Sequence, residues 1–261
     1  MSKHADTAPA ELWVVPLNDL EAQEIVHLLD EQHRRVLISY QRWGATWAGL
    51  EKEIREFIIE RLGDGSVQVI GVELGGANPY GAINIDHHRY RDDDRFRVDA
   101  SIEQIAERLG IGLRRRQKLI GVNDRAWIPG LRREFPGISD PELTSLRRED
   151  RRIQGVTVND EKQARADMAK ARFEQRRCTV SSDHRATSAL FDFLLLETDT
   201  NEILAMSPDL WQYTGPRVGL FSGLEWGENH WSGGETGSGY FCLERPSAED
   251  QARMTQTFDS A

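Results

Sequence analysis

In the first 110 residues, segments whose apolar side chains recur at helical spacing alternate with short, continuous apolar runs. The helical patterns cover residues 20–29, 50–62 and 101–110. The apolar runs, which predict strands, cover residues 36–40, 66–74 and 82–85. Because a helix is the usual connection between two parallel strands, this alternation predicts an α/β layer with a mostly parallel sheet.

The second half of the chain has a different composition. Residues 140–178 combine helical spacing with interleaved acids and bases, which predicts a solvated surface or connecting helix. The runs "SALFDFLLLET", "EILAMS" and "RVGLFSG" predict three further strands, and glycines are frequent near the end. The expected organisation is an α/β domain at 1–155, a connecting helix at 156–180 and a smaller, glycine-rich, substrate-binding α/β domain at 181–261.

The formal net charge of −10 gives the chain no general attraction for polyanions. Long duplex nucleic acid is therefore not an expected partner, whereas a small anionic substrate is, because local charge can override the net value. The sequence contains neither a signal-peptide core nor an apolar run long enough to span a membrane, so we expect a cytoplasmic protein without a membrane partner. Whether it forms a homo-oligomer stays open.

Two histidines and a carboxylate follow directly after a predicted strand. Asp86, His87 and His88 come after the apolar run at 82–85. In open α/β sheets, ligands bind at the carboxyl ends of strands, and Glu73 also lies at such an end. Carboxylate and imidazole together are suitable ligands for Mn, Zn or Fe. With Asp124, which follows a predicted helix, these residues predict a divalent metal site formed by Glu73, His87 and Asp124.

The stretch "INIDHH" resembles the third signature of the DHH phosphoesterase superfamily, which includes RecJ-like nucleases, oligoribonucleases and manganese pyrophosphatases. The order of other features agrees with that family, since an acid precedes the signature at Glu73 and another follows at Asp124. The glycine-rich segment "SGGETGSGYF" resembles the substrate loop of the family's C-terminal domain. The resemblance implies a DHH-type N-terminal domain, a smaller C-terminal α/β domain and a cleft between them.

The resemblance also implies a role for each matching residue. His87 and Asp124 would ligate the metal, and Glu73 stands where the family usually has a bridging Asp. Asp86 would orient the histidines and His88 would contact a substrate phosphate. Further substrate contacts are expected from Arg125, Trp43, Thr46, His230, Gly233, Gly234 and Glu235, although Glu235 stands where the family often has histidine.

The sequence departs from the family at the first signature, which supplies one His and two Asp after the first strand. The corresponding stretch here, "ISYQRWGATWAGL", contains neither residue type. A symmetric two-metal site is therefore not expected, and at most one metal is. Trp43 could stack on a base or sugar and Thr46 could face an anion, but core or interface anchoring of the tryptophans is an equally good interpretation. For the glycines at 233–239, ordinary glycine-rich β-turns are as good an interpretation as a substrate loop.

Three functional hypotheses follow. The first is a metal-dependent, hydrolase-like enzyme acting on a small phosphorylated or nucleotide-like molecule in an interdomain cleft. The second is a non-catalytic ligand-binding or scaffold protein derived from the same fold. The third is an enzyme of different chemistry that uses the histidine pair for acid–base catalysis without phosphoester hydrolysis.

Overall fold

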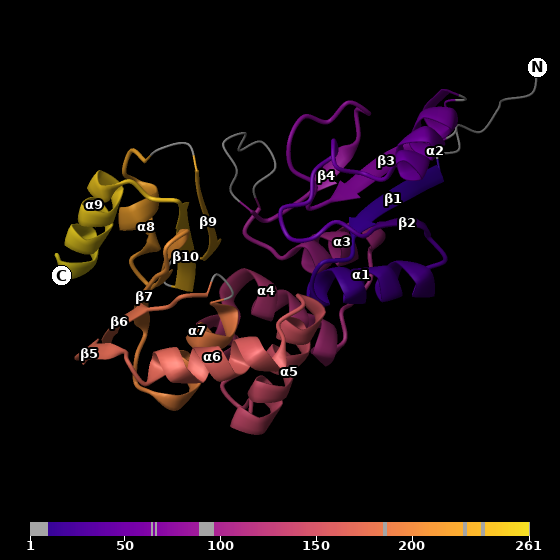
Figure 1. Ribbon diagram of the computed structural model, residues 1–261. Helices are drawn as coiled ribbons and strands as arrows, with labels where there is room; N and C mark the ends of the chain where they lie inside the picture. The colour runs from indigo at the N-terminus through magenta and orange to yellow at the C-terminus, as the bar shows by residue number, and fades with distance from the viewer. Residues whose placement is uncertain are drawn as a thin grey trace, which may run out of the picture. The chain divides into compact units, whose positions relative to one another are not determined.

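Figure 1 shows the computed structural model, which describes residues 10–63, 65, 67–88, 97–184, 187–226, 229–235 and 238–260. The chain divides into two compact units. The first comprises Met1–Asp86 with Ser101–Gly112, and the second comprises His87–Ala100 with Leu113–Ala261. This division differs from the predicted domain boundary at residue 155. Among the helices of the described residues, none is both long and apolar enough to cross a membrane.

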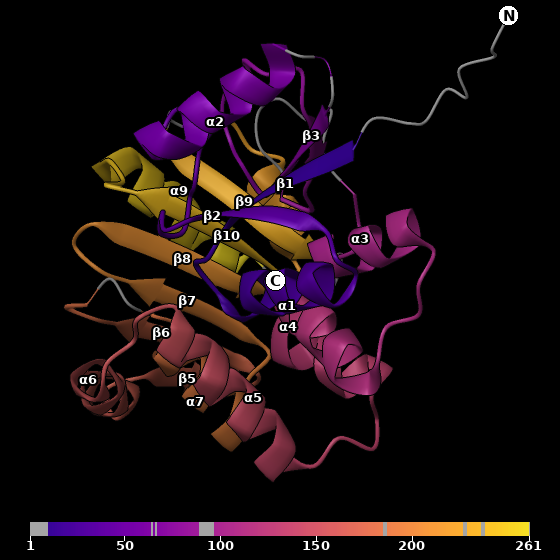
Figure 2. The same ribbon diagram turned by 90° about the vertical axis from the view of Figure 1, so that its right-hand side faces the viewer.

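The first unit is an α/β layer. Its strands are β1 (Ala10–Pro16), β2 (Arg35–Ser39), β3 (Val67–Val72) and β4 (Ile83–Ile85), and its helices are α1 (Leu20–Glu31), α2 (Lys52–Gly63) and α3 (Ser101–Leu109). The described strands pair in the order β2-β1-β3-β4, and every pair is parallel. Figures 1 and 2 show α2 on one face of this sheet and α1 with α3 on the other. The predicted parallel sheet is therefore confirmed for this unit.

Trp47 fills the core between α2 and the sheet. Its side chain is fully buried, and its indole N–H donates to Oδ1 of Asn84 at 3.2 Å. The ring lies directly on Gly71 of β3, where a Cβ atom would be only 2.2 Å from Trp47 Cζ2. Of the two tryptophans in the 38–50 stretch, Trp47 is thus a core residue, and Gly71 is required by its close approach.

We expect Gly71→Ala to lower the free energy of unfolding by about 1–3 kcal/mol, because the added methyl group overpacks the Trp47 ring. Urea unfolding followed by tryptophan fluorescence would measure the loss. Gly112→Ala is the matched control, because a Cβ there has no heavy atom within 4 Å. Equal stability of the two variants would contradict this packing.

The second unit contains a mixed sheet. Its strands are β5 (Arg172–Glu174), β6 (Arg177–Ser181), β7 (Glu202–Met206), β8 (Leu210–Gly215), β9 (His230–Glu235) and β10 (Ser238–Glu244). The described strands pair in the order β5-β6-β7-β8-β10-β9, with only β6 and β7 parallel. Its helices are α4 (Arg115–Glu134), α5 (Asp140–Ile153), α6 (Val158–Met168), α7 (Ser188–Glu197), α8 (Val218–Ser222) and α9 (Ala248–Asp259).

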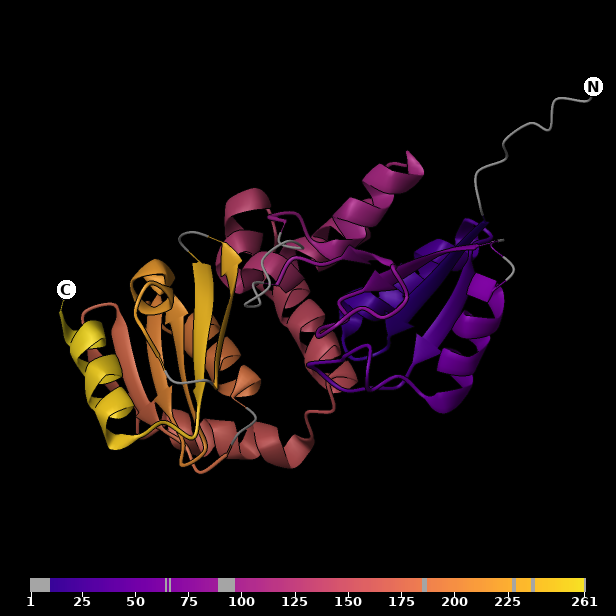
Figure 3. The same ribbon diagram turned by 90° about the horizontal axis from the view of Figure 1, so that it is seen from above.

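Both faces of this second sheet are covered by helices. Figure 3 shows α9, in yellow, against one face. The aromatic core there contains Tyr213, Phe221, Phe241 and Phe258, and the rings of Tyr213 and Phe221 stack with centroids 4.0 Å apart. On the other side, α4 packs against β9 and β10. The second unit is therefore an α/β body with its own core, but it is larger than the predicted C-terminal domain.

Two predicted strands of this unit are helices. The run "SALFDFLLLET" forms α7, whose residues 189–195 are all buried, and "RVGLFSG" forms α8. A helix buried on all sides has no amphipathic period, so a continuous apolar run does not distinguish it from a buried strand. The strand predicted from "EILAMS" is confirmed as β7.

The segment 140–178 is not one continuous helix, and only part of it is solvated. Within it, α6 is largely exposed, with only Ala164 and Asp167 buried. The segment contains α5, α6 and the edge strand β5, and three charged residues of α5 are buried, namely Arg147, Asp150 and Arg151. Arg147 donates from Nε to Asp192 Oδ1 at 2.9 Å and from Nη1 to Asp150 Oδ2 at 2.7 Å. Arg151 also pairs with Asp192. For α5, the prediction of a solvated helix is wrong, because these charges are neutralised by partners inside the unit instead of by water.

Candidate metal centre

Glu73 lies just after β3, at the carboxyl edge of the first sheet. It is buried and has a φ of +51°, a left-handed conformation that is uncommon for glutamate. Its backbone N–H donates to Ile85 O at 2.9 Å, and its carboxylate accepts a hydrogen bond from Ser101 Oγ at 2.8 Å. Such backbone conformations occur often at functional sites, because the surrounding structure must hold them in place.

Glu21 is a site residue that the sequence analysis missed. It lies in α1, is buried, and accepts a hydrogen bond from the Ile102 N–H at 3.0 Å. One oxygen of its carboxylate is within 4.8 Å of an oxygen of Glu73. The residue was missed because the first strand was placed at 36–40, whereas β1 precedes it. The apolar run "LWVV" followed by Asp19 and Glu21 was the available signal.

Asp86 follows β4 and is fully buried. Its backbone carbonyl accepts a hydrogen bond from Gln104 Nε2 at 3.0 Å, so the first turn of α3 holds the chain just before His87. The expected role of Asp86 in orienting the histidines stays a prediction.

His87 and Asp124 meet in the second unit. His87 Nε2 lies 2.5 Å from Asp124 Oδ2, and their side chains are 4% and 19% exposed. The His88 ring lies beside that of His87, with centroids 4.2 Å apart. The structure therefore brings together three residues that the sequence analysis assigned to one site.

The helix that carries Asp124 is interrupted nearby. The predicted helix ended near residue 123, but α4 continues to Glu134 across a kink at Trp127, which has a φ of 54° and a ψ of −152°. Pro129 follows the kink and disfavours a helical conformation in the residue before it. Before the kink, Asn123 accepts a hydrogen bond from buried Arg147 Nη1 at 2.8 Å, which fixes the turn of α4 that presents Asp124.

The glycine-rich hairpin lies beside this part of α4. Gly234 of β9 has a φ of +82°, and a Cβ atom there would be 3.4 Å from the carbonyl oxygen of Arg125 and 2.8 Å from Gly239 Cα. A Cβ atom at this position would clash with Gly239 within the hairpin, whereas its distance to the Arg125 carbonyl is that of an ordinary van der Waals contact. The second unit thus places Gly234 close to the carbonyl of Arg125, the residue after Asp124.

The other predicted contacts of this unit have protein neighbours. Arg125 forms a two-pronged ion pair with Glu134, with N–O distances of 2.9 and 2.6 Å. The His230 ring stacks on Phe241, and Gly233 lies against Tyr240. Glu235 is the last residue of β9. For Arg125, His230 and Gly233, the structure offers packing or ion pairing as one explanation of the residue type.

Burial tends to raise the pKa of Glu134, but the hydrogen bonds and charges of Arg125 and Arg133 outweigh it and lower the pKa. A lowered folded-state pKa stabilises the fold above the ordinary glutamate pKa of ~4.3 and ceases to do so as the pH falls through the folded value. We expect Glu134→Gln to be less stable than wild type at pH 7, with the difference disappearing under acidic conditions. Urea unfolding across this pH range would test it, and a pH-independent difference would contradict it.

Trp43 and Thr46 lie in the first unit, after β2. Trp43 is 53% exposed and Tyr40 is 75% exposed. The Thr46 N–H donates to Gln41 Oε1 at 3.1 Å, and the segment is tied to the chain beyond Glu73 by Gly75 N donating to Ala45 O at 2.8 Å. The loop is therefore held firmly while two aromatic side chains face solvent.

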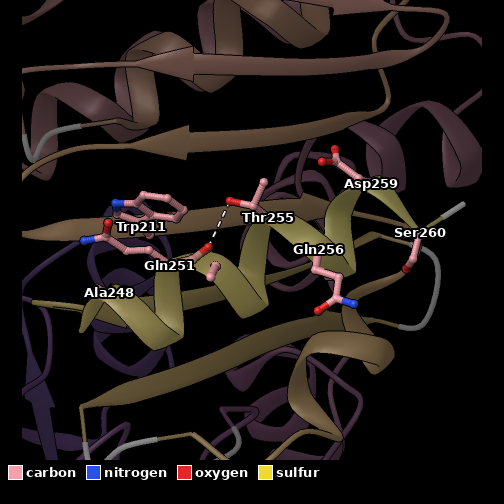
Figure 4. A pocket seen from close by; sticks show the side chains of 8 residues that line it. Trp211, Ala248, Gln251, Thr255, Gln256, Asp259 and Ser260 are labelled. Carbon is pink, nitrogen blue, oxygen red and sulfur yellow. Dashed lines mark hydrogen bonds between the residues drawn. The ribbon is translucent and has the colours of Figure 1, made fainter.

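A separate hollow in the second unit, shown in Figure 4, lies between α9 and Trp211. Thr255 Oγ1 at its wall donates to the backbone of Gln251 at 2.9 Å. None of the predicted site residues lines this hollow, and its one ionisable side chain is Asp259. The hollow is therefore not the candidate centre.

The two cysteines are buried and are not joined in a disulfide. Burial raises the pKa of the Cys178 thiol to about 12, so the reactive thiolate is scarce at neutral pH. This argues against a cysteine nucleophile.

No protein-family model matches the sequence, and no curated protein matches it. Membership of the DHH superfamily therefore stays an interpretation of "INIDHH" and of the order of features around it.

Proposed function

We propose that the chain is a metal-dependent hydrolase that acts on a small phosphorylated or nucleotide-like molecule, with His87 and Asp124 as ligands of one divalent cation. The observation that carries the proposal is the 2.5 Å approach of a largely buried imidazole nitrogen to a carboxylate oxygen. This donor pair suits Mn²⁺, Zn²⁺ or Fe²⁺. When bound, such an ion activates a water molecule and polarises a phosphoryl oxygen.

Glu73 is the proposed third ligand, and covalent connectivity supports it. Its backbone bonds to Ile85, which is two residues before His87. Because consecutive Cα atoms are 3.8 Å apart, the Cα of His87 lies within about 8 Å of that of Ile85 in any arrangement of the units. Glu21, beside Glu73, adds a second carboxylate at the same edge of the sheet.

Substrate binding would draw on residues around this centre. His88 and Arg125 would attract an anion, for which Arg125 would exchange its ion pair with Glu134. Within the first unit, the exposed rings of Trp43 and Tyr40 are suited to stacking on a base, which makes a nucleotide a candidate substrate.

Hydrolysis assays would test this function. Purified protein with Mn²⁺, Zn²⁺ or Fe²⁺ should release phosphate or nucleotide from at least one of a panel of mononucleotides, short dinucleotides, pyrophosphate and sugar phosphates. EDTA and Asp124→Asn should abolish the activity, while Asp259→Asn, in the separate hollow, should retain it. Absence of turnover with every substrate and metal would reject the hydrolase.

A non-catalytic ligand-binding protein is the second candidate. It is favoured by the absence of acids from residues 40–50, after β2, and by the pairing of Arg125 with Glu134. This candidate predicts saturable binding of a nucleotide, measured by quenching of Trp43 fluorescence, without any turnover.

A further inference from the structure

We infer that the first turn of α3 positions the acidic ligands of the proposed metal centre, and that Ser101 is its main positioning residue. This inference rests on the proposed function. Three groups of that one turn reach site residues that are distant in the sequence. Ser101 Oγ donates to the Glu73 carboxylate at 2.8 Å, the Ile102 N–H donates to the Glu21 carboxylate at 3.0 Å, and Gln104 Nε2 donates to the Asp86 carbonyl at 3.0 Å.

The two carboxylates need these donors. Glu21 and Glu73 are both buried, and their oxygens approach within 4.8 Å, so two negative charges would repel each other in a poorly solvated place. The first N–H groups of a helix lack partners within the helix and carry a partial positive charge. The turn therefore offsets part of the repulsion and fixes one oxygen of each carboxylate, while a divalent cation would offset more of it.

The Ser101 hydroxyl acts on a site residue instead of on its own helix. The hydroxyl donates its proton to the Glu73 carboxylate, and the Gln104 amide donates to the Asp86 carbonyl. Ser101 is fully buried, so water cannot replace Glu73 as the partner of its hydroxyl group. Ser101 thus holds the side chain of Glu73, whose left-handed backbone already fixes its direction.

The Gln104 contact acts through the backbone. It holds the Asp86 carbonyl, which belongs to the peptide group that continues into His87. Loss of this hydrogen bond would release the chain immediately before the imidazole ligand. Ser101 and Gln104 therefore control different ligands from the same turn.

Calorimetric titration of the full-length chain with Mn²⁺ tests the inference. Because partners that orient metal ligands typically contribute 10–100-fold to metal affinity, we expect Ser101→Ala to weaken Mn²⁺ binding by about that factor. Gln104→Met, which keeps the side-chain length but removes the amide donor, should also weaken it. Ser207→Ala is the matched control, because Ser207 is a buried serine that bonds only within its own turn at Leu210. Circular dichroism would confirm that each variant is folded.

The outcomes separate the two proposals. Wild-type binding that is weakened in the α3 variants and unchanged in Ser207→Ala supports the inference. If Ser101→Ala and Gln104→Met bind Mn²⁺ as tightly as wild type, the positioning role is wrong and the metal centre stands. The same holds if Ser207→Ala weakens Mn²⁺ binding as much as they do. If wild type binds no Mn²⁺, both proposals are wrong.

Discussion

Asp192→Ala is expected to lower the free energy of unfolding by about 3–5 kcal/mol. Asp192 is fully buried in α7 and accepts hydrogen bonds from both Arg147 and Arg151, which are themselves buried. Removing the carboxylate leaves two guanidinium groups in the interior without their shared counter-charge. Arg147 keeps its pair with Asp150 and Arg151 its pair with Glu161, but each loses a buried hydrogen-bonded partner, which costs more than the net value of an intact ion pair.

Equilibrium unfolding in urea measures this loss. Glu56→Ala is the control, because Glu56 forms an exposed ion pair with Lys52 at 3.6 Å, and exposed pairs contribute roughly 0–1 kcal/mol. A loss below 1 kcal/mol for Asp192→Ala would contradict the buried network. Since Arg147 also holds Asn123, next to Asp124, we further expect the variant to bind metal more weakly.

His87→Ala should reduce divalent-cation affinity by more than about 100-fold. Partners that only orient a ligand already contribute 10–100-fold, so loss of a ligand should exceed that range. The His87 imidazole is largely buried against Asp124. In the described part of the chain, His88 is the one histidine whose ring lies beside it and could replace it as a ligand.

Titration of the variant with Mn²⁺ and Zn²⁺ provides the measurement. His27→Ala is the control, because His27 is exposed on α1. Retention of wild-type affinity by His87→Ala would remove His87 from the centre, and loss of affinity in His27→Ala would show that binding is not specific.

Local patterns in the sequence predicted much of the first unit. The apolar runs at 66–74 and 82–85 form β3 and β4, and the parallel sheet follows from the helices between strands. Residue chemistry predicted one site from His87, after a strand end, and Asp124, after a predicted helix, and the structure places the two in contact. The strand predictions succeed because they use features that are close together in the chain.

The remaining features depend on contacts between distant residues. Arg147 and Asp192 are 45 positions apart, so a charged helix was predicted to be solvated although its charges are paired in the interior. Glu21 was missed because β1 was not recognised, and its contact with α3 joins residues 81 positions apart. Gly234 was assigned to substrate binding, but its proximity to the Arg125 carbonyl joins residues 109 positions apart and depends on the path of α4.

The stoichiometry of Mn²⁺ binding tests the metal centre most directly. Protein stripped with EDTA and dialysed should take up one Mn²⁺ per chain, measured by elemental analysis, and Asp124→Asn should take up none at the same free concentration. The absence of bound metal in wild type, or equal uptake by Asp124→Asn, would contradict a cation site at His87 and Asp124.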